Sequence, residues 1–221
     1  DNINDYYSIS LKKNKLKELK KFKKFSFFKI DLNNKNKLNK TFNKYKFTSV
    51  FHFAAQAGVR YSVEYPSKYI ESNIRGFFNI LETIRKKNIK NFFYASSSSV
   101  YGNSKNFPLK ESQNLKPTNT YSLTKKFNED LSEIFSKYYK IKPIGIRFFT
   151  VYGEWGRPDM FISKAITAAF KKKKLYINNY GNHSRDFTYI MDVNIILYKL
   201  MKSKISVDKN VINICSNKPI N

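Results

Sequence analysis

The chain has 221 residues, 41% hydrophobic and 17% aromatic, which is typical of a globular protein with one substantial core and excludes a disordered chain. Its formal net charge is +26, but the lysines are spread over helix-like stretches. We therefore expect the charges to lie on solvated surfaces and expect no nucleic-acid partner. No apolar run approaches the roughly 20 residues of a membrane span, and no signal peptide is visible, so we expect no membrane contact and a cytoplasmic location.

The spacing of apolar residues predicts alternating helices and strands along the chain. Helices are expected over 11–22, 35–45, from Pro66 through Ile84, 121–139 and 161–171. Strands are expected over 26–30, 49–54, 91–95, 143–149, 175–177 and 211–214. This alternation indicates an α/β fold of the Rossmann type, with a doubly wound parallel sheet and helices on both faces.

The predicted elements divide the chain into two parts. Residues 1–149 are expected to form the dinucleotide-binding sheet domain, and residues 150–221 part of a smaller substrate-binding lobe that is interleaved with the sheet. Such a lobe would close over the carboxyl ends of the strands, where folds of this kind bind ligands.

A Tyr-x-x-x-Lys pair, Tyr121 and Lys125, stands in the predicted helix over 121–139. Residues four apart on a helix lie on one face, about one turn apart. A free phenol has a pKa near ~10, and a neighbouring ammonium favours the phenolate, so we expect Lys125 to lower the pKa of Tyr121. Taken alone, the pair is common on surface helices.

A run of serines, Ser96–Ser99, ends the predicted strand over 91–95 and is followed by Val-Tyr-Gly. Hydroxyls at the carboxyl end of a strand can donate a hydrogen bond to a substrate oxygen. A serine-rich turn that caps a helix is the ordinary alternative. Together with the Tyr-x-x-x-Lys pair, the run forms a much rarer combination than either part.

These segments, together with 51–60, 147–153 and 185–190, occur in the order seen in extended short-chain dehydrogenases/reductases. The chain therefore resembles the NAD-dependent epimerase/dehydratase family. The segment 154–160, Glu-Trp-Gly-Arg-Pro-Asp-Met, is most similar to the UDP-glucuronate 4-epimerase branch. The resemblance covers nearly the whole chain.

The resemblance implies roles for particular residues. Tyr121 would be the acid/base on the sugar 4-hydroxyl, Lys125 would tune it and bind the nicotinamide ribose, and Ser97 would bond the same oxygen. The implied NAD-binding residues are Asp1, Asp31, Leu32, Phe53, Ala54, Ala55, Gln56, Asn73, Tyr121 and Lys125. The implied UDP-sugar contacts are Ser98, Ser99, Thr150, Arg157, Arg185 and Arg60, with Arg185 facing the diphosphate.

The implied reaction passes through a 4-keto sugar, with NAD kept bound between turnovers. Dehydratases of the family carry Asp-Glu after the catalytic Ser or Thr, and decarboxylases a Glu where Ser99 stands; here Ser98 and Ser99 follow Ser97. This favours C4 epimerisation over elimination. Arg157 is the expected contact of a uronate carboxylate, so UDP-glucuronate and UDP-galacturonate are the expected pair; a surface arginine in a structural loop stays the alternative.

The family begins with a strand and a Gly-rich phosphate turn, and this chain contains no Gly-x-x-Gly-x-x-Gly segment. Asp1 matches an acidic ribose ligand after the second strand. Two interpretations stay open: an incomplete sequence of a normal enzyme, expected to be a homodimer at full length, or a non-catalytic remnant acting as a binding or dimerisation module. For the free chain we expect weak or absent NAD binding.

The remaining conspicuous residues predict no further site. His52 lies in an apolar strand and His183 in a turn, and the single cysteine, Cys215, has no metal-ligand spacing, so no metal is expected. Glu129 and Glu133 are expected to form exposed pairs with lysines of the same helix.

Overall fold

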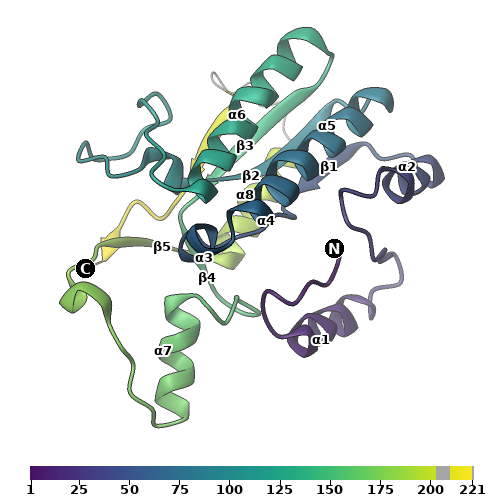
Figure 1. Cartoon of the computed structure of the whole chain (residues 1–221). Helices are drawn as coiled ribbons and strands as arrows, with labels where there is room; N and C mark the ends of the chain where they lie inside the picture. The colour runs from purple at the N-terminus through teal and green to yellow at the C-terminus, as the bar shows by residue number, and fades with distance from the viewer. Residues whose placement is uncertain (203–209, 221) are drawn as a thin grey trace.

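The computed structural model describes residues 1–202 and 210–220, and its centre is a four-stranded parallel sheet. The strand order is β1 (Ser49–His52), β2 (Asn91–Ser97), β3 (Lys142–Phe148) and β6 (Val211–Ile214). Every neighbouring pair is parallel, so all carboxyl ends lie at one edge of the sheet. Figure 1 shows the crossing helices in front of and behind it. The predicted α/β fold of the Rossmann type is confirmed.

The central strand β2 places successive aromatic side chains on opposite faces, as the pleat requires. Phe92 and Tyr94 pack into a core with α2 (Lys35–Lys44), α5 (Gly76–Lys86) and α6 (Thr120–Tyr138). Phe93, between them, faces a second core covered by α8 (Ile190–Lys202). A strand buried on both faces is typical of a doubly wound sheet.

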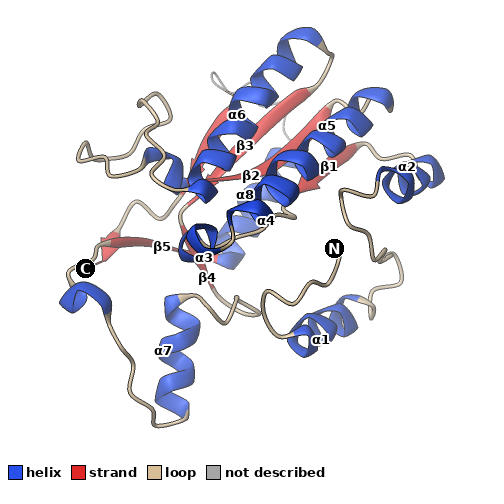
Figure 2. Ribbon diagram, in the orientation of Figure 1, coloured by secondary structure: helices blue, strands red, loops and turns tan. Residues whose placement is uncertain are grey.

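A second, smaller sheet has the order β4 (Thr150–Tyr152), β5 (Arg185–Tyr189) and β7 (Pro219–Ile220). The helix α7 (Phe161–Phe170) lies between its strands in sequence and stands apart from the main sheet (Figure 2). After α8 the chain returns to the main sheet as β6. The division at residue 149 into a sheet domain and an interleaved lobe stays a prediction.

The first half of the chain carries short helices ahead of α5. These are α1 (Ile9–Leu19), α3 (Val59–Glu64) and α4 (Pro66–Tyr69). The π-helix η1 (Ile70–Arg75) joins α4 to α5, so the single long helix expected from Pro66 through Ile84 contains a wider turn. The turn directs Asn73 into the interior, where it is 1% exposed.

Two predicted strands are wrong. Residues 26–30 are extended but form no ladder: β1 is the edge of the main sheet on that side, and the segment's one recorded backbone bond to another part of the chain joins Ile30 N to Asp1 O at 3.2 Å. Residues 175–177 are likewise unpaired, between α7 and the 3-10 turn η3 (Asn178–Gly181). A β-type pattern without a neighbouring strand leaves backbone groups to the solvent.

Candidate functional site

Tyr121 lies in the first turn of α6, at the carboxyl edge of the main sheet. The helix begins there because Asn119 caps it: the Asn119 side chain accepts from Ser122 N, and Ser122 Oγ accepts from Asn119 N, a reciprocal capping box. This fixes the half-buried Tyr121 beside the end of β2, where the Ser97 hydroxyl hydrogen-bonds to its phenol oxygen. The helix N-terminus also favours negative charge at this position.

The pKa of Tyr121 is raised above its ordinary value, chiefly because the phenol is buried, and this corrects the expected lowering. The hydrogen bond from Ser97 and the charge of Arg157 lower it, without offsetting burial. Lys125 is not among the causes: its Nζ lies 5.8 Å from the centre of the Tyr121 ring. The phenol therefore needs further positive charge to act as a base near neutral pH.

Lys125 is 3% exposed, on the same face of α6 as Tyr121. Its Nζ donates to Ala95 O on β2 at 2.7 Å, its only recorded hydrogen bond in the part of the chain that the structure describes. Burial lowers the pKa of its ammonium to about 8. The side chain is therefore a buried cation with hydrogen-bonding capacity to spare.

Ser97 Oγ is surrounded by donors from the turn that follows β2. That turn is the 3-10 helix η2 (Ser98–Tyr101), and Ser99 donates to Ser97 Oγ from its backbone N at 3.2 Å and from its Oγ at 2.9 Å. Since two donors occupy the lone pairs of Ser97, its own proton is free to point toward Tyr121 or a substrate oxygen. Ser98 belongs to the same turn.

The residues expected to line the cofactor follow the end of β1. Asn73 clamps the backbone of Gln56: its Oδ1 accepts from Gln56 N at 2.7 Å, and its Nδ2 donates to Gln56 O at 3.0 Å and to Thr124 Oγ1 on α6 at 3.1 Å. This ties the loop after β1 to the helix that carries Tyr121. The intervening residues are exposed or half-buried: Phe53, Ala54 and Ala55.

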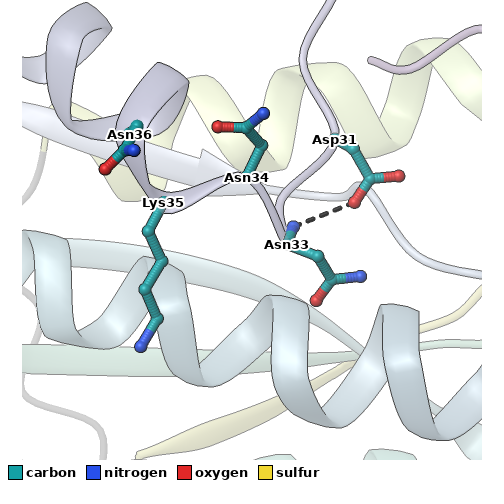
Figure 3. A pocket seen from close by; sticks show the side chains of 5 residues that line it. All are labelled: Asp31, Asn33, Asn34, Lys35 and Asn36. Atoms are coloured by element: carbon teal, nitrogen blue, oxygen red, sulfur yellow. Dashed lines mark hydrogen bonds between the residues drawn. The ribbon is translucent and has the colours of Figure 1, made fainter.

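One expected cofactor residue, Asp31, lines an open depression of about 500 Å³ at the start of α2. The other lining residues are Asn33, Asn34, Lys35 and Asn36 (Figure 3). Asp31 Oδ1 accepts from Asn33 N at 2.9 Å. Asn2 Nδ2 donates to Asp31 Oδ2 at 2.9 Å, which brings the exposed Asp1 into the same neighbourhood. Leu32 packs its side chain against the core instead.

The four predicted substrate contacts beyond the serines lie in different places. Thr150 opens β4 and lines a small pocket with residues of 151–163. Arg157 follows in the loop before α7, close enough to lower the pKa of Tyr121. Arg185 is exposed at the start of β5 and donates to Ser184 O at 2.8 Å. Arg60 is exposed on α3, and over the described residues no ion pair or hydrogen bond is recorded for it.

Glu129 was expected to form an exposed pair, and this is wrong. It is 8% exposed and forms a two-pronged ion pair with Arg147 of β3, with Nε–Oε1 at 2.9 Å and Nη2–Oε2 at 2.7 Å. Ser96 on β2 also donates to Glu129 Oε1. Although Arg147 is more than fifteen residues away in sequence, α6 crosses β3 with this face inward, so the exposed lysines of the helix are not its partners.

Sequence reasoning missed three residues near the site. Tyr69 packs edge-on against the Tyr121 ring, with centroids 6.1 Å apart, and donates to Ala57 O at 2.8 Å. Asp159 pairs with Arg157, and Tyr6 contacts Asp159. An acid two positions after Arg157 was the available signal for Asp159, whereas Tyr6 is 153 residues from its partner.

Other classes of site receive no support in the described residues. They contain no group of three or more His, Cys, Asp or Glu side chains placed to hold a metal ion. His52 is buried between aromatic rings, and burial lowers its pKa to about 3. Among the helices of residues 1–202 none has the length and apolar character of a membrane span.

The sequence profile of the NAD dependent epimerase/dehydratase family matches residues 5–215. With its parallel sheet and its Ser97, Tyr121 and Lys125 at one sheet edge, the chain belongs to this family.

Two curated proteins show the extent of the similarity. It is 47% identical to Protein CapI of Staphylococcus aureus over 95% of the chain and 63% of that protein. It is 42% identical to UDP-glucuronate 4-epimerase 2 of Arabidopsis thaliana over 87% of the chain and 45% of that protein. The chain thus spans about half to two thirds of the length of these relatives.

The structure of UDP-glucuronic acid 4-epimerase from Bacillus cereus, in complex with UDP-glucuronic acid and NAD, superimposes with a TM-score of 0.91. The sequences are 31% identical, and the match covers the whole of this chain and 69% of that one. The UDP-N-acetylglucosamine 4-epimerase from Methanobrevibacter ruminantium M1 matches with a TM-score of 0.80 at 30% identity, over 87% of this chain and 62% of that one.

Proposed function

We propose that the protein is an NAD-dependent nucleotide-sugar 4-epimerase that interconverts UDP-glucuronate and UDP-galacturonate. The proposal rests on the surroundings of the Tyr121 phenol. The Ser97 hydroxyl and the charge of Arg157 both act on it, and Lys125 is buried one turn away on the same helix. A proton acceptor, an oxygen-binding hydroxyl and a cation suited to a carboxylate are the parts that oxidation at C4 of a uronate needs.

The residues present fit a bound dinucleotide. Lys125 is a buried ammonium with donors to spare, the Gln56 backbone is fixed by Asn73, and Asp31 offers a carboxylate beside an open depression of ligand size. Held by these residues, NAD would supply the hydride acceptor and donor for C4 of the sugar. Its positive nicotinamide would also supply charge that lowers the pKa of Tyr121.

The chain's own residues handle the proton. Tyr121, as phenolate, would accept the proton of the 4-hydroxyl and return it when the hydroxyl is restored. Ser97 would donate to the 4-oxygen and hold it toward Tyr121. Because Ser98 and Ser99 follow Ser97 where an elimination would need carboxylates, proton removal from a neighbouring carbon has no base at this point of the site.

The Tyr121→Phe variant tests this proposal. In protein incubated with NAD, UDP-glucuronate and UDP-galacturonate are quantified by liquid chromatography from either starting sugar. The unaltered protein is expected to bring both to one mixture, and Tyr121→Phe to lower kcat by about 10²- to 10⁴-fold while still binding substrate, since only the proton acceptor is removed. Epimerisation of neutral UDP-hexoses alone would move the assignment to another UDP-sugar epimerase.

We also propose that the enzyme is a homodimer. Leu123, Phe127 and Ile134 are 56%, 39% and 52% exposed and share one face of α6, and Phe78 on α5 is 39% exposed. Apolar side chains gathered on neighbouring helices suit an isologous interface. By light scattering, the protein is expected to have twice the chain mass and Phe127→Asp the single mass; a monomeric unaltered protein would contradict the proposal.

A further inference from the structure

Arg157 is held by an acidic neighbour in its own loop. Asp159 Oδ1 lies 3.1 Å from Arg157 Nε, and Arg157 Nη2 donates to Asp159 Oδ2 at 3.1 Å. Both side chains are about one-third exposed. The pair occupies the Nε/Nη2 side of the guanidinium, whereas for Nη1 no hydrogen bond is recorded in the described residues. A planar guanidinium held on one side keeps its other side available for a second carboxylate.

Asp159 is in turn fixed by the N-terminal segment. The Tyr6 hydroxyl lies 3.1 Å from Asp159 Oδ2 and donates to it, and the Arg157 guanidinium carbon lies 5.9 Å from the centre of the Tyr6 ring. Figure 1 shows the segment before α1 running beside the loop that leads into α7. Tyr6 therefore contacts both members of the pair from a remote part of the chain.

The position of Tyr6 depends on a glycine. Gly58 has φ +101°, and a Cβ there would collide with the Tyr6 hydroxyl. The Gly58 carbonyl shares the single hydroxyl proton of Tyr69 with Ala57 O, and the Tyr69 ring meets Tyr121 edge-on at 6.1 Å. Tyr61 packs against Tyr6 with centroids 5.0 Å apart. A chain of contacts through Gly58 and Tyr69 thus joins Tyr6, which holds Asp159, to Tyr121.

We propose that Asp159, fixed by Tyr6, is a specificity-determining positioning residue: it orients Arg157 so that Nη1 faces the carboxylate of a nucleotide-linked hexuronic acid. The inference rests on the proposed function. A free arginine side chain loses rotamer entropy on binding, so an arginine already fixed binds a carboxylate more tightly. A neutral nucleotide hexose offers no carboxylate and should be insensitive to this orientation.

The test is a set of dissociation constants measured by calorimetry in the presence of NAD. UDP-glucuronate and UDP-glucose are titrated into protein carrying Tyr121→Phe, so that no turnover disturbs the heats. Asp159→Asn is expected to weaken UDP-glucuronate binding about tenfold, and Tyr6→Phe about threefold, each with little change for UDP-glucose. Two matched controls are used. Tyr7→Phe removes the adjacent hydroxyl, for which the described residues record a bond from Lys15 and none to Asp159. Asp130→Asn breaks a pair on α6.

Each other outcome has a definite meaning. An equal loss for both nucleotide sugars would show that Asp159 only supports the loop, and would overturn the proposal. Unchanged or tighter UDP-glucuronate binding in Asp159→Asn would overturn it too, because the carboxylate would then be neutral or repulsive. Unaltered UDP-glucuronate binding in Arg157→Ala, or no preference for the uronate in the parent, would instead break the proposed function at its carboxylate contact. Tyr6→Phe removes one oxygen only, so it remains informative if Asp159→Asn fails to fold.

Discussion

The buried charge of Lys125 serves its proposed function but destabilises the folded chain. Its ammonium is 3% exposed, and burial lowers its pKa from 10.5 to about 8. At neutral pH the folded chain must keep a charge that water would solvate better, which by the pKa difference costs about 3 kcal/mol of folding free energy. Retaining such a group is expected where function requires a cation.

Lys125→Met is therefore expected to stabilise the protein at pH 7 by about 2 kcal/mol, since relief from burying the charge exceeds the lost hydrogen bond to Ala95 O. Below pH 8 both folded and unfolded chains carry the proton and the full difference is present. Between pH 8 and 10.5 the folded chain releases its proton first, so the unaltered protein gains stability and the difference closes. Urea unfolding at several pH values measures this difference in unfolding free energy between the variant and the unaltered protein. Lys126→Met, one residue along and one-third exposed, is the matched control.

For single residues, the sequence indicated which side chains lie close together but not how their surroundings shift their pKa values. Ser97, Tyr121 and Lys125 were predictable because strand ends and helix spacing follow from local pattern. The direction of the Tyr121 pKa shift was not, because burial is a property of the packed site. Tyr6 was missed because its contact with Asp159 spans 153 residues, so no local pattern around Tyr6 indicates it.

Among the elements, α6 is joined to the sheet by a buried polar network. Glu129 pairs with Arg147 of β3 and accepts from Ser96 of β2, and Arg147 Nη1 donates to the Tyr101 hydroxyl of η2 at 2.8 Å. Tyr101 donates onward to Asn213 of β6 at 2.8 Å. The network thus connects the helix that bears Tyr121 with the strand that bears Ser97.

Glu129→Ala is expected to lower the free energy of unfolding by about 3 to 5 kcal/mol, because it leaves the Arg147 charge buried without a partner. Asp130→Ala is the matched control on the next residue: its pair with Lys126 is largely exposed and should be worth less than about 1 kcal/mol. Denaturant unfolding of both variants gives the comparison. Similar small effects in both would show that Arg147 regains solvent or another partner.

The elements that the sequence predicted correctly are those whose partners are local or numerous. The helix α6 and the strands β2 and β3 differ from expectation only at their ends. Residues 26–30 carry a strand pattern but form no ladder, because pairing depends on what lies alongside and not on the segment itself. The π-turn at Asn73 was likewise hidden, since one extra residue in a turn barely changes the apolar spacing.

In the molecule as a whole, the smaller sheet and the N-terminal segment lie near the carboxyl edge of the main sheet. The carboxyl ends of β1, β2 and β3 carry the loop to Gln56, Ser97 and the start of β4, while residues before α1 contact the loop before α7. The parallel α/β architecture was predictable from alternating patterns. The contact between Asn213 of β6 and the Tyr101 hydroxyl of η2 required the structure, because the two residues lie 112 positions apart in sequence.

The fate of the hydrogen on C4 tests the proposed chemistry most directly. Protein with bound NAD is incubated in ordinary water with UDP-glucuronate deuterated at C4, and the product is analysed by mass spectrometry and NMR. Oxidation and reduction at C4 within one closed site predict UDP-galacturonate with nearly all of the deuterium still on C4, now on the opposite face. Product that has lost its deuterium to water, or no product inverted at C4, would contradict epimerisation by Ser97, Tyr121 and a retained NAD.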